Sequence, residues 1–114
     1  MKTPAPLIAA LVLAASTATA EAPIIERITQ TSGRFSVTLS HPDTGWDHYA
    51  DGWRIELADG TVLGTRELVH PHVDEQPFTR STSVNLPDSV TRVFIRARCN
   101  LDGWNADAVA FELN

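Results

Sequence analysis

Apolar and polar residues alternate along most of the chain after residue 22. In segment 34–40, for example, Phe35, Val37 and Leu39 fall on one face of an extended chain and polar residues fall on the other. A period of two predicts β-strands rather than helices, whose apolar positions recur with a period of 3.6 residues. The pattern yields seven short strands, at 24–28, 34–40, 53–57, 61–69, 78–86, 90–99 and 109–113. We therefore expect an all-β domain, built as a single antiparallel β-sandwich.

Three residues add detail to this pattern. Asp59 and Gly60 stand between the third and fourth strands, and both tolerate the positive φ angles of a two-residue hairpin turn. Gly64 interrupts the fourth strand, which indicates a bulge or a close contact at that point. Arg80 falls on the apolar face of the fifth strand, near the preceding loop.

The first twenty residues differ from the rest of the chain. Lys2 precedes an apolar run at 7–15, and the small residues Ala18, Thr19 and Ala20 follow it. This order is typical of a secretory signal peptide, and the apolar run is too short to span a bilayer. We expect a signal peptide at 1–20 and a β-sandwich domain at 21–114, exported to the periplasm or the cell exterior. The mature chain has no predicted membrane span.

The charge and the cysteine content of the chain exclude some classes of protein. The formal net charge is −5, and every cationic residue after the expected signal peptide is an arginine. An acidic domain without a basic stripe is poorly suited to binding nucleic acid. Cys99 is the only cysteine, so the domain has no internal disulfide. Its inward position in strand 90–99 predicts a buried, inert thiol.

Several residues together resemble a known class of domain. Trp53 opens the third strand, Val93, Ile95 and Ala97 form a V-x-I-x-A strand, and Trp104 follows a glycine before the last strand. In these features the chain resembles fibronectin type III and immunoglobulin-like domains, and the missing disulfide favours the fibronectin-like variant. Segment 41–53 is also similar to small exported bacterial proteins of uncharacterised function, a likeness that implies no role.

The resemblance implies that three loops lie together. With the strands in the order of that family, the loops 41–52, 70–77 and 100–107 meet at one end of the sandwich, which we call the loop pole. The loop pole contains all four histidines, together with many carboxylates and aromatic rings. The residues that we expect to bind a ligand there are Asp43, Trp46, Asp47, Tyr49, Asp74, Glu75, Arg80 and Trp104.

These features predict a non-enzymatic binding or adaptor module for a protein, small-molecule or carbohydrate ligand. No G-x-S-x-G, H-E-x-x-H or similar motif indicates catalysis, so we predict no catalytic residue. A carbohydrate site that uses Trp46 and Trp104 is one alternative, and it requires at least one exposed ring. A purely structural role is another, in which the aspartates cap turns and an acid pairs with Arg80.

A transition-metal site is the most specific alternative to the binding module. The binding module itself is expected to have no cofactor. Imidazole nitrogens suit Zn or Cu, and His70 and His72 with either His48 or His41 would supply three ligands. Against this site, Pro71 holds its neighbours extended, which separates alternate side chains, and no H-x-x-x-H or C-x-x-C spacing is present. The pattern leaves open whether the four histidines meet.

Overall fold

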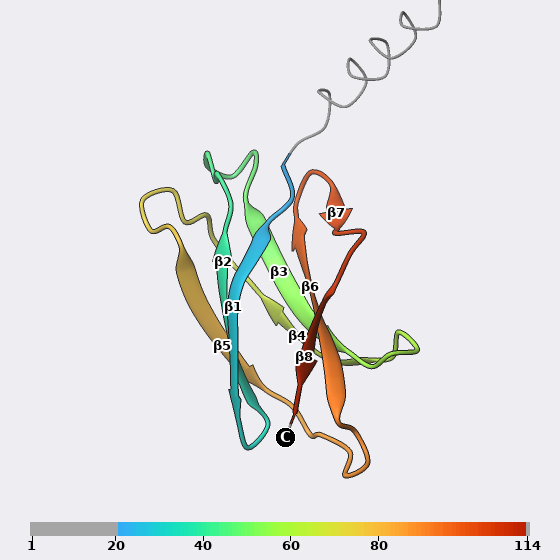
Figure 1. The fold of residues 1–114 in the computed structure, drawn as a ribbon. Coiled ribbons are helices and arrows are strands. Elements are labelled where there is room, and N and C mark those ends of the chain that lie inside the picture. The colour runs from blue at the N-terminus through green and yellow to red at the C-terminus, as the bar shows by residue number, and fades with distance from the viewer. Residues whose placement is uncertain (1–20, 114) are drawn as a thin grey trace, which may run out of the picture.

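The computed structural model describes residues 21–113, and these fold into β-strands without a helix (Figure 1). The expected signal peptide at 1–20 lies outside the described residues. The all-β prediction is confirmed. The strands are β1 (Ile24–Thr31), β2 (Arg34–Ser40), β3 (Ala50–Glu56), β4 (Val62–Glu67), β5 (Phe78–Ser83), β6 (Arg92–Cys99), β7 (Gly103–Trp104) and β8 (Val109–Glu112). The two-residue strand β7 lies inside the loop predicted at 100–107.

The strands form two antiparallel sheets that pack on one another in a sandwich-like arrangement (Figure 1). One sheet has the order β1-β2-β5, and the other has the order β4-β3-β6, with both β7 and β8 paired to β6. The chain crosses from one sheet to the other after β2, after β4 and after β5. β4 pairs with β3 in a hairpin, which is the strand order that the expected loop pole requires.

The core lies between the sheets and follows the predicted alternation. The inward residues Phe35, Val37 and Leu39 of β2 are fully or almost fully buried. Alternate residues of β6 are buried in the same way, from Val93 to Cys99. Trp53 on β3 is the largest fully buried side chain, with none of its surface exposed. Burial of these apolar faces supplies the main stabilisation of a domain that has no disulfide.

The turn between β3 and β4 differs from the prediction. Leu57 N donates to Thr61 O (2.8 Å) and Gly60 N donates to Leu57 O (2.9 Å), so the loop contains the three residues 58–60. Of these, Gly60 alone has a positive φ, of 92°. A three-residue loop needs one left-handed residue, whereas the predicted two-residue turn needs two. Asp59 instead accepts a hydrogen bond from Thr61 N (3.0 Å), and this bond lowers the pKa of its carboxyl.

The close contact predicted at Gly64 is confirmed. A Cβ atom at this position would overlap Cγ1 of Val84, which follows β5 and is half-buried against the core. Gly64 therefore allows β4 to approach the chain of the other sheet. Val84 is β-branched and stiff, so it has little freedom to move aside.

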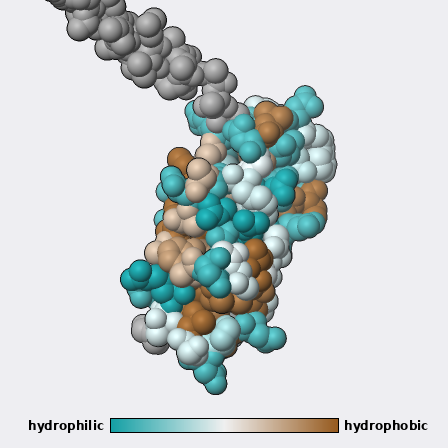
Figure 2. Space-filling view, turned by 90° about the vertical axis from the view of Figure 1, so that its right-hand side faces the viewer, coloured by the Kyte–Doolittle hydropathy of each residue, from teal (hydrophilic) through white to brown (hydrophobic). Residues whose placement is uncertain are grey.

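Ion pairs cover the outward face of the β3–β6 sheet. Arg96 Nε lies 2.8 Å from Glu56, and Arg98 Nε lies 2.8 Å from Asp51. The hydrogen bond from Arg96 is the main cause of the lowered pKa of Glu56, and it raises the pKa of Arg96 in turn. Viewed from the side of β7 and β8, hydrophilic and apolar residues are mixed over the surface (Figure 2). Among residues 21–113, the structure contains no helix long and apolar enough to cross a membrane.

Candidate functional site

The three loops of the loop pole meet at the same end of the sandwich (Figure 1). His41 N donates to Gln76 Oε1 (3.0 Å), which connects the first loop with the second. Asn100 N donates to Tyr49 O (3.1 Å), which connects the first loop with the third. These hydrogen bonds confirm the expected convergence of loops that are far apart in the sequence.

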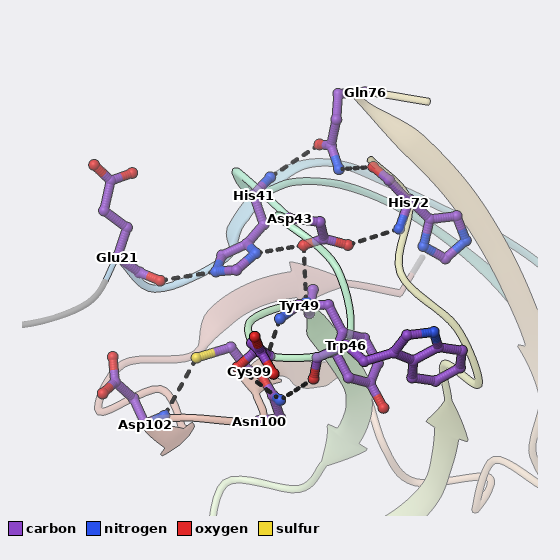
Figure 3. A network of polar contacts seen from close by, with 12 residues as sticks. Glu21, His41, Asp43, Trp46, Tyr49, His72, Gln76, Cys99, Asn100 and Asp102 are labelled. Carbon is purple, nitrogen blue, oxygen red and sulfur yellow. Dashed lines mark hydrogen bonds and ion pairs between the residues drawn. The ribbon is translucent and has the colours of Figure 1, made fainter. Parts of the chain in front are cut away.

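Asp43 lies at the centre of this network (Figure 3). Its Oδ1 lies 2.5 Å from His41 Nδ1 and accepts a hydrogen bond from Ala50 N (3.0 Å). Its Oδ2 accepts a hydrogen bond from His72 N (2.8 Å). The carboxylate is buried, and a buried carboxylate is tolerated when donors satisfy its oxygens. Asp43 thus fixes the start of β3 and the 70–77 loop relative to the end of β2, which is a structural role.

Both ring nitrogens of His41 have hydrogen-bond partners. Nδ1 lies 2.5 Å from Oδ1 of Asp43, and Nε2 lies 3.0 Å from the carbonyl oxygen of Glu21. A carbonyl oxygen only accepts, so Nε2 is the donor to Glu21. The side chains of His41 and Asp43 form a buried pair in which neither is exposed. Glu21 itself is exposed.

Asn100 joins the first and third loops with its side chain. Its Oδ1 accepts a hydrogen bond from Tyr49 N (2.9 Å). Its Nδ2 donates to the carbonyl oxygens of Trp46 (3.1 Å) and Asp47 (3.3 Å). Sequence reasoning missed both Asn100 and Gln76, whose Nε2 donates to His72 O (2.8 Å). In the sequence, Asn100 is only an amide residue directly after a predicted strand, and Gln76 is only an amide residue directly before a proline.

His72 is buried without any hydrogen bond to its ring. The ring stacks on Phe78 with 3.9 Å between the centroids, and both nitrogens are buried and unpartnered. Burial, with Arg80 and His70 nearby, lowers the pKa of His72, so the neutral ring is favoured. His70 is exposed, and its ring centroid lies 4.6 Å from that of His72.

A groove of about 510 Å³ separates the first loop from the second. Its apolar lining comes from Trp46, Pro71 and Val73, and Asp74 and Glu75 lie at the same groove. The side chain of Trp46 is 65% exposed, although its backbone carbonyl is held by Asn100. The Tyr49 ring meets Trp46 edge-on, with 5.5 Å between the centroids (Figure 3). The groove thus contains an exposed but positioned aromatic ring.

The charged groups near the groove fall into two kinds. Arg80 Nη2 binds Glu75 Oε1 at 3.0 Å, which is the kind of ion pair that the structural alternative allows for Arg80. This hydrogen bond lowers the pKa of Glu75. Asp47 and Asp74 are exposed and take part in no ion pair among the described residues. Their carboxylates are available to a ligand.

Trp104 is placed differently from Trp46. The guanidinium groups of Arg54 and Arg98 lie over its ring, at 4.0 Å and 5.0 Å from the centroid. The ring is half-buried in these cation–π contacts on the outward face of β6. Of the two tryptophans of the loop pole, Trp46 is the one with an exposed ring.

Two separate groups of histidines occupy the loop pole. His70 and His72 form one pair, as described above. His41 and His48 form another, with 4.6 Å between the ring centroids at an angle of 89°. In the described part of the chain, His41 and His48 lie with Cys99 in a cluster of metal-ligating side chains. Cys99 is a buried free thiol, as predicted. No feature of the sequence indicated that it would lie close to two histidines.

Comparison with curated proteins identifies a relative in Halomicrobium mukohataei, named "Putative lipoprotein". It is 38% identical over 96 residues, which are 81% of this chain. The chain spans about half the length of that relative, or 47%. No protein-family model matches the chain. No solved structure matches it.

Proposed function

We propose that this chain is an exported, non-enzymatic binding module of the fibronectin type III-like kind, with its ligand held in the groove of the loop pole. The observation that carries the proposal is the exposed ring of Trp46 above the 70–75 segment. Removing a large aromatic ring from water is favourable, and a ring that is already fixed in place loses little entropy on binding. Aromatic residues of this kind are enriched at binding surfaces.

The chemistry of the groove favours an extended, positively charged segment of a partner protein. Trp46, Pro71 and Val73 offer apolar contacts, and Asp74, which also lines the groove, has a carboxylate without an ion pair among the described residues. The exposed carboxylate of Asp47 is next to Trp46 in the chain. A cationic side chain gains from the ring by a cation–π contact and from the carboxylates by charge attraction. The chain has a net charge of −5, which steers a basic partner towards it.

Two observations support export. Residues 1–20 have the order of charge, apolar run and small residues that is typical of a signal peptide. The relative in Halomicrobium mukohataei is named as a lipoprotein, a class of exported, membrane-anchored proteins. From these two observations we extend export to this chain.

Carbohydrate binding is a second candidate function, and it is favoured by the same exposed ring. Sugars stack on tryptophan faces and hydrogen-bond to carboxylates, which Asp47 and Asp74 supply. Trp46 alone would form the platform, because the Trp104 ring is covered by Arg54 and Arg98. The position of Trp104 removes it from the expected sugar site.

Peptide titration into the EDTA-treated protein tests the proposal. We expect a short peptide of alternating arginine and proline to bind, to change Trp46 fluorescence and to weaken with salt. Trp46→Ala should lower the affinity at least about tenfold, as for an interface hot spot, and Asp74→Asn should reduce the salt dependence. The control Val62→Ala truncates an exposed apolar residue at the end of β4 that is away from the loop pole. This variant should bind the peptide with the affinity of the wild type. Peptide binding that is unchanged in Trp46→Ala would refute the proposal that the groove is the binding site. Binding of oligosaccharides but not of the peptide would support the second candidate function.

A further inference from the structure

The cluster of His41, His48 and Cys99 lies at the base of the loop pole, outside the groove. One potential ligand atom from each residue lies within 4.8 Å of the other two. His41 and Cys99 are almost fully buried, and His48 is half-buried. Two imidazoles and one thiol that face one another in an interior are the donor set of a transition-metal site.

The backbone of His48 and of Cys99 is held in place before any metal binds. Cys99 ends β6, where it pairs with Ala50 of β3 and Gly103 of β7. The backbone of His48 is fixed by a small turn, in which Thr44 N donates to His48 O (3.0 Å) and His48 N donates to Gly45 O (3.2 Å). Such fixed positions reduce the free energy that must be spent on ordering the ligands.

The outer contacts of the cluster are those of a metal site. Asp43 holds Nδ1 of His41, so a metal would take Nε2, which in the structure lies 3.0 Å from the carbonyl oxygen of Glu21 (Figure 3). Metal-bound histidines commonly donate their other ring proton to a carboxylate in this way. Asp102 N donates to Cys99 Sγ (3.3 Å), a bond that stabilises a thiolate (Figure 3). Nε2 of His48 is buried without a hydrogen-bond partner in the described part of the chain, and a metal ion would satisfy it.

We propose that His41, His48 and Cys99 bind one Zn²⁺ ion. A divalent ion balances the charges at the site, because the Cys99 thiolate and the Asp43 carboxylate carry one negative charge each. Binding displaces the Glu21 carbonyl from Nε2 of His41 and releases to solvent the proton of that nitrogen and the thiol proton of Cys99. The fourth position of a tetrahedral ion is left to water, which enters beside the exposed Glu21.

The distances require only a small closure of the cluster. Ligand atoms around tetrahedral zinc are about 3.3–3.7 Å apart, given bond lengths of about 2.0–2.3 Å. The largest separation of 4.8 Å allowed here exceeds this by roughly 1 Å. This site replaces the metal ligands anticipated from the sequence, since it includes Cys99 and omits both His70 and His72. It does not depend on the groove proposed above.

Cobalt and zinc titrations of the whole chain test the site. Co²⁺ should give the intense near-ultraviolet band of a thiolate ligand and the visible bands of a tetrahedral ion, and one equivalent of Zn²⁺ should abolish both. Competition against a chromophoric chelator should show one zinc per chain. Cys99→Ser should remove the thiolate band and lower zinc affinity more than about 100-fold, which exceeds the loss from an outer-shell change.

Two further variants separate this site from other histidines. His48→Gln should weaken zinc binding more than about tenfold. The control His70→Gln changes an exposed histidine and should leave both the spectrum and the affinity unchanged. A wild-type protein without the thiolate band overturns the proposal whether or not the variants fold. Tight binding of copper without zinc, or zinc binding lost in His70→Gln, would overturn it as well. Peptide binding in EDTA tests the groove separately, so the two proposals can fail independently.

Discussion

Oδ1 of Asp43 lies 2.5 Å from Nδ1 of His41, and neither side chain is exposed to solvent. The same carboxylate receives backbone hydrogen bonds from Ala50 and His72. A single buried carboxyl group therefore ties together the end of β2, the start of β3 and the second loop of the pole. Removing it would leave several donors unsatisfied in the interior.

Asp43→Asn is expected to destabilise the domain by about 3–5 kcal/mol, because it leaves more than one buried donor unsatisfied at a cost of about 1–3 kcal/mol each. The amide of asparagine keeps one acceptor oxygen but replaces the other with an NH₂ group. That NH₂ group would face a hydrogen-bond donor of the protein and could not accept from it. Urea unfolding followed by circular dichroism measures the change. The matched control is Asp47→Asn, which alters an exposed carboxylate of the same loop and should stay within about 0.5 kcal/mol of wild type. Equal effects of the two variants would contradict the central role of Asp43.

The burial of His72 predicts a pH dependence of stability. Its pKa is lowered in the folded state, so the unfolded chain binds more protons between the folded value and the ordinary value near 6.5. The contribution of His72 is fully present above about pH 6.5 and is lost as the pH falls through the folded pKa. His72→Phe keeps a ring against Phe78 and removes the titrating group, so its stability should fall less between pH 7 and pH 5. Parallel pH profiles for the two proteins would exclude this effect.

Trp53 is the largest buried side chain, and Trp53→Ala should cost about 3–5 kcal/mol. Its indole nitrogen has no hydrogen-bond partner in the described residues, so Trp53→Phe loses volume but no hydrogen bond and should cost less. Thermal and urea unfolding measure both changes. Trp46→Ala, at an exposed ring, provides the comparison and should leave stability nearly unchanged. A near-neutral Trp53→Ala would show that the inward register of β3 is wrong.

Gly64→Ala should destabilise the domain by about 1–3 kcal/mol, because the added methyl group overlaps Val84. Val84→Ala makes room for that methyl group. The double variant should therefore be more stable than the sum of the single changes predicts, and a double-mutant cycle measures the difference. Additive effects would mean that the cost at Gly64 comes from the backbone and not from Val84.

The alternation of apolar residues is enough to predict most of the fold. It identifies β2 and β6 with the correct inward residues, because each strand has one face in the core and one face away from it. The close contact at Gly64 is predictable because a glycine inside a strand commonly marks a bulge or the near approach of another segment. The Asp59-Gly60 turn is wrong in detail, since the sequence does not show that Ala58 joins the loop.

The site is predictable in location but not in its contacts. The loop pole follows from strand order, and Arg80 pairs with an acid, as the structural alternative allowed. The cluster of His41, His48 and Cys99 joins residues more than fifty positions apart, and no short spacing marks it. The alternation of strand 90–99 correctly predicts that Cys99 is buried. It does not predict which polar side chains from other loops lie next to it. The buried state of His72 has no sequence signal for the same reason.

The two carboxyl oxygens of Asp43 contact two different parts of the loop pole. One holds the ring of His41, beside Cys99, and the other holds the backbone of His72, beside the groove that contains Trp46. An ion at the first part and a ligand at the second would share this carboxylate. If zinc alters the affinity of the groove, thermodynamic linkage requires the groove ligand to alter zinc affinity by the same factor. If both sites are occupied, Asp43 is the side chain through which they would be coupled.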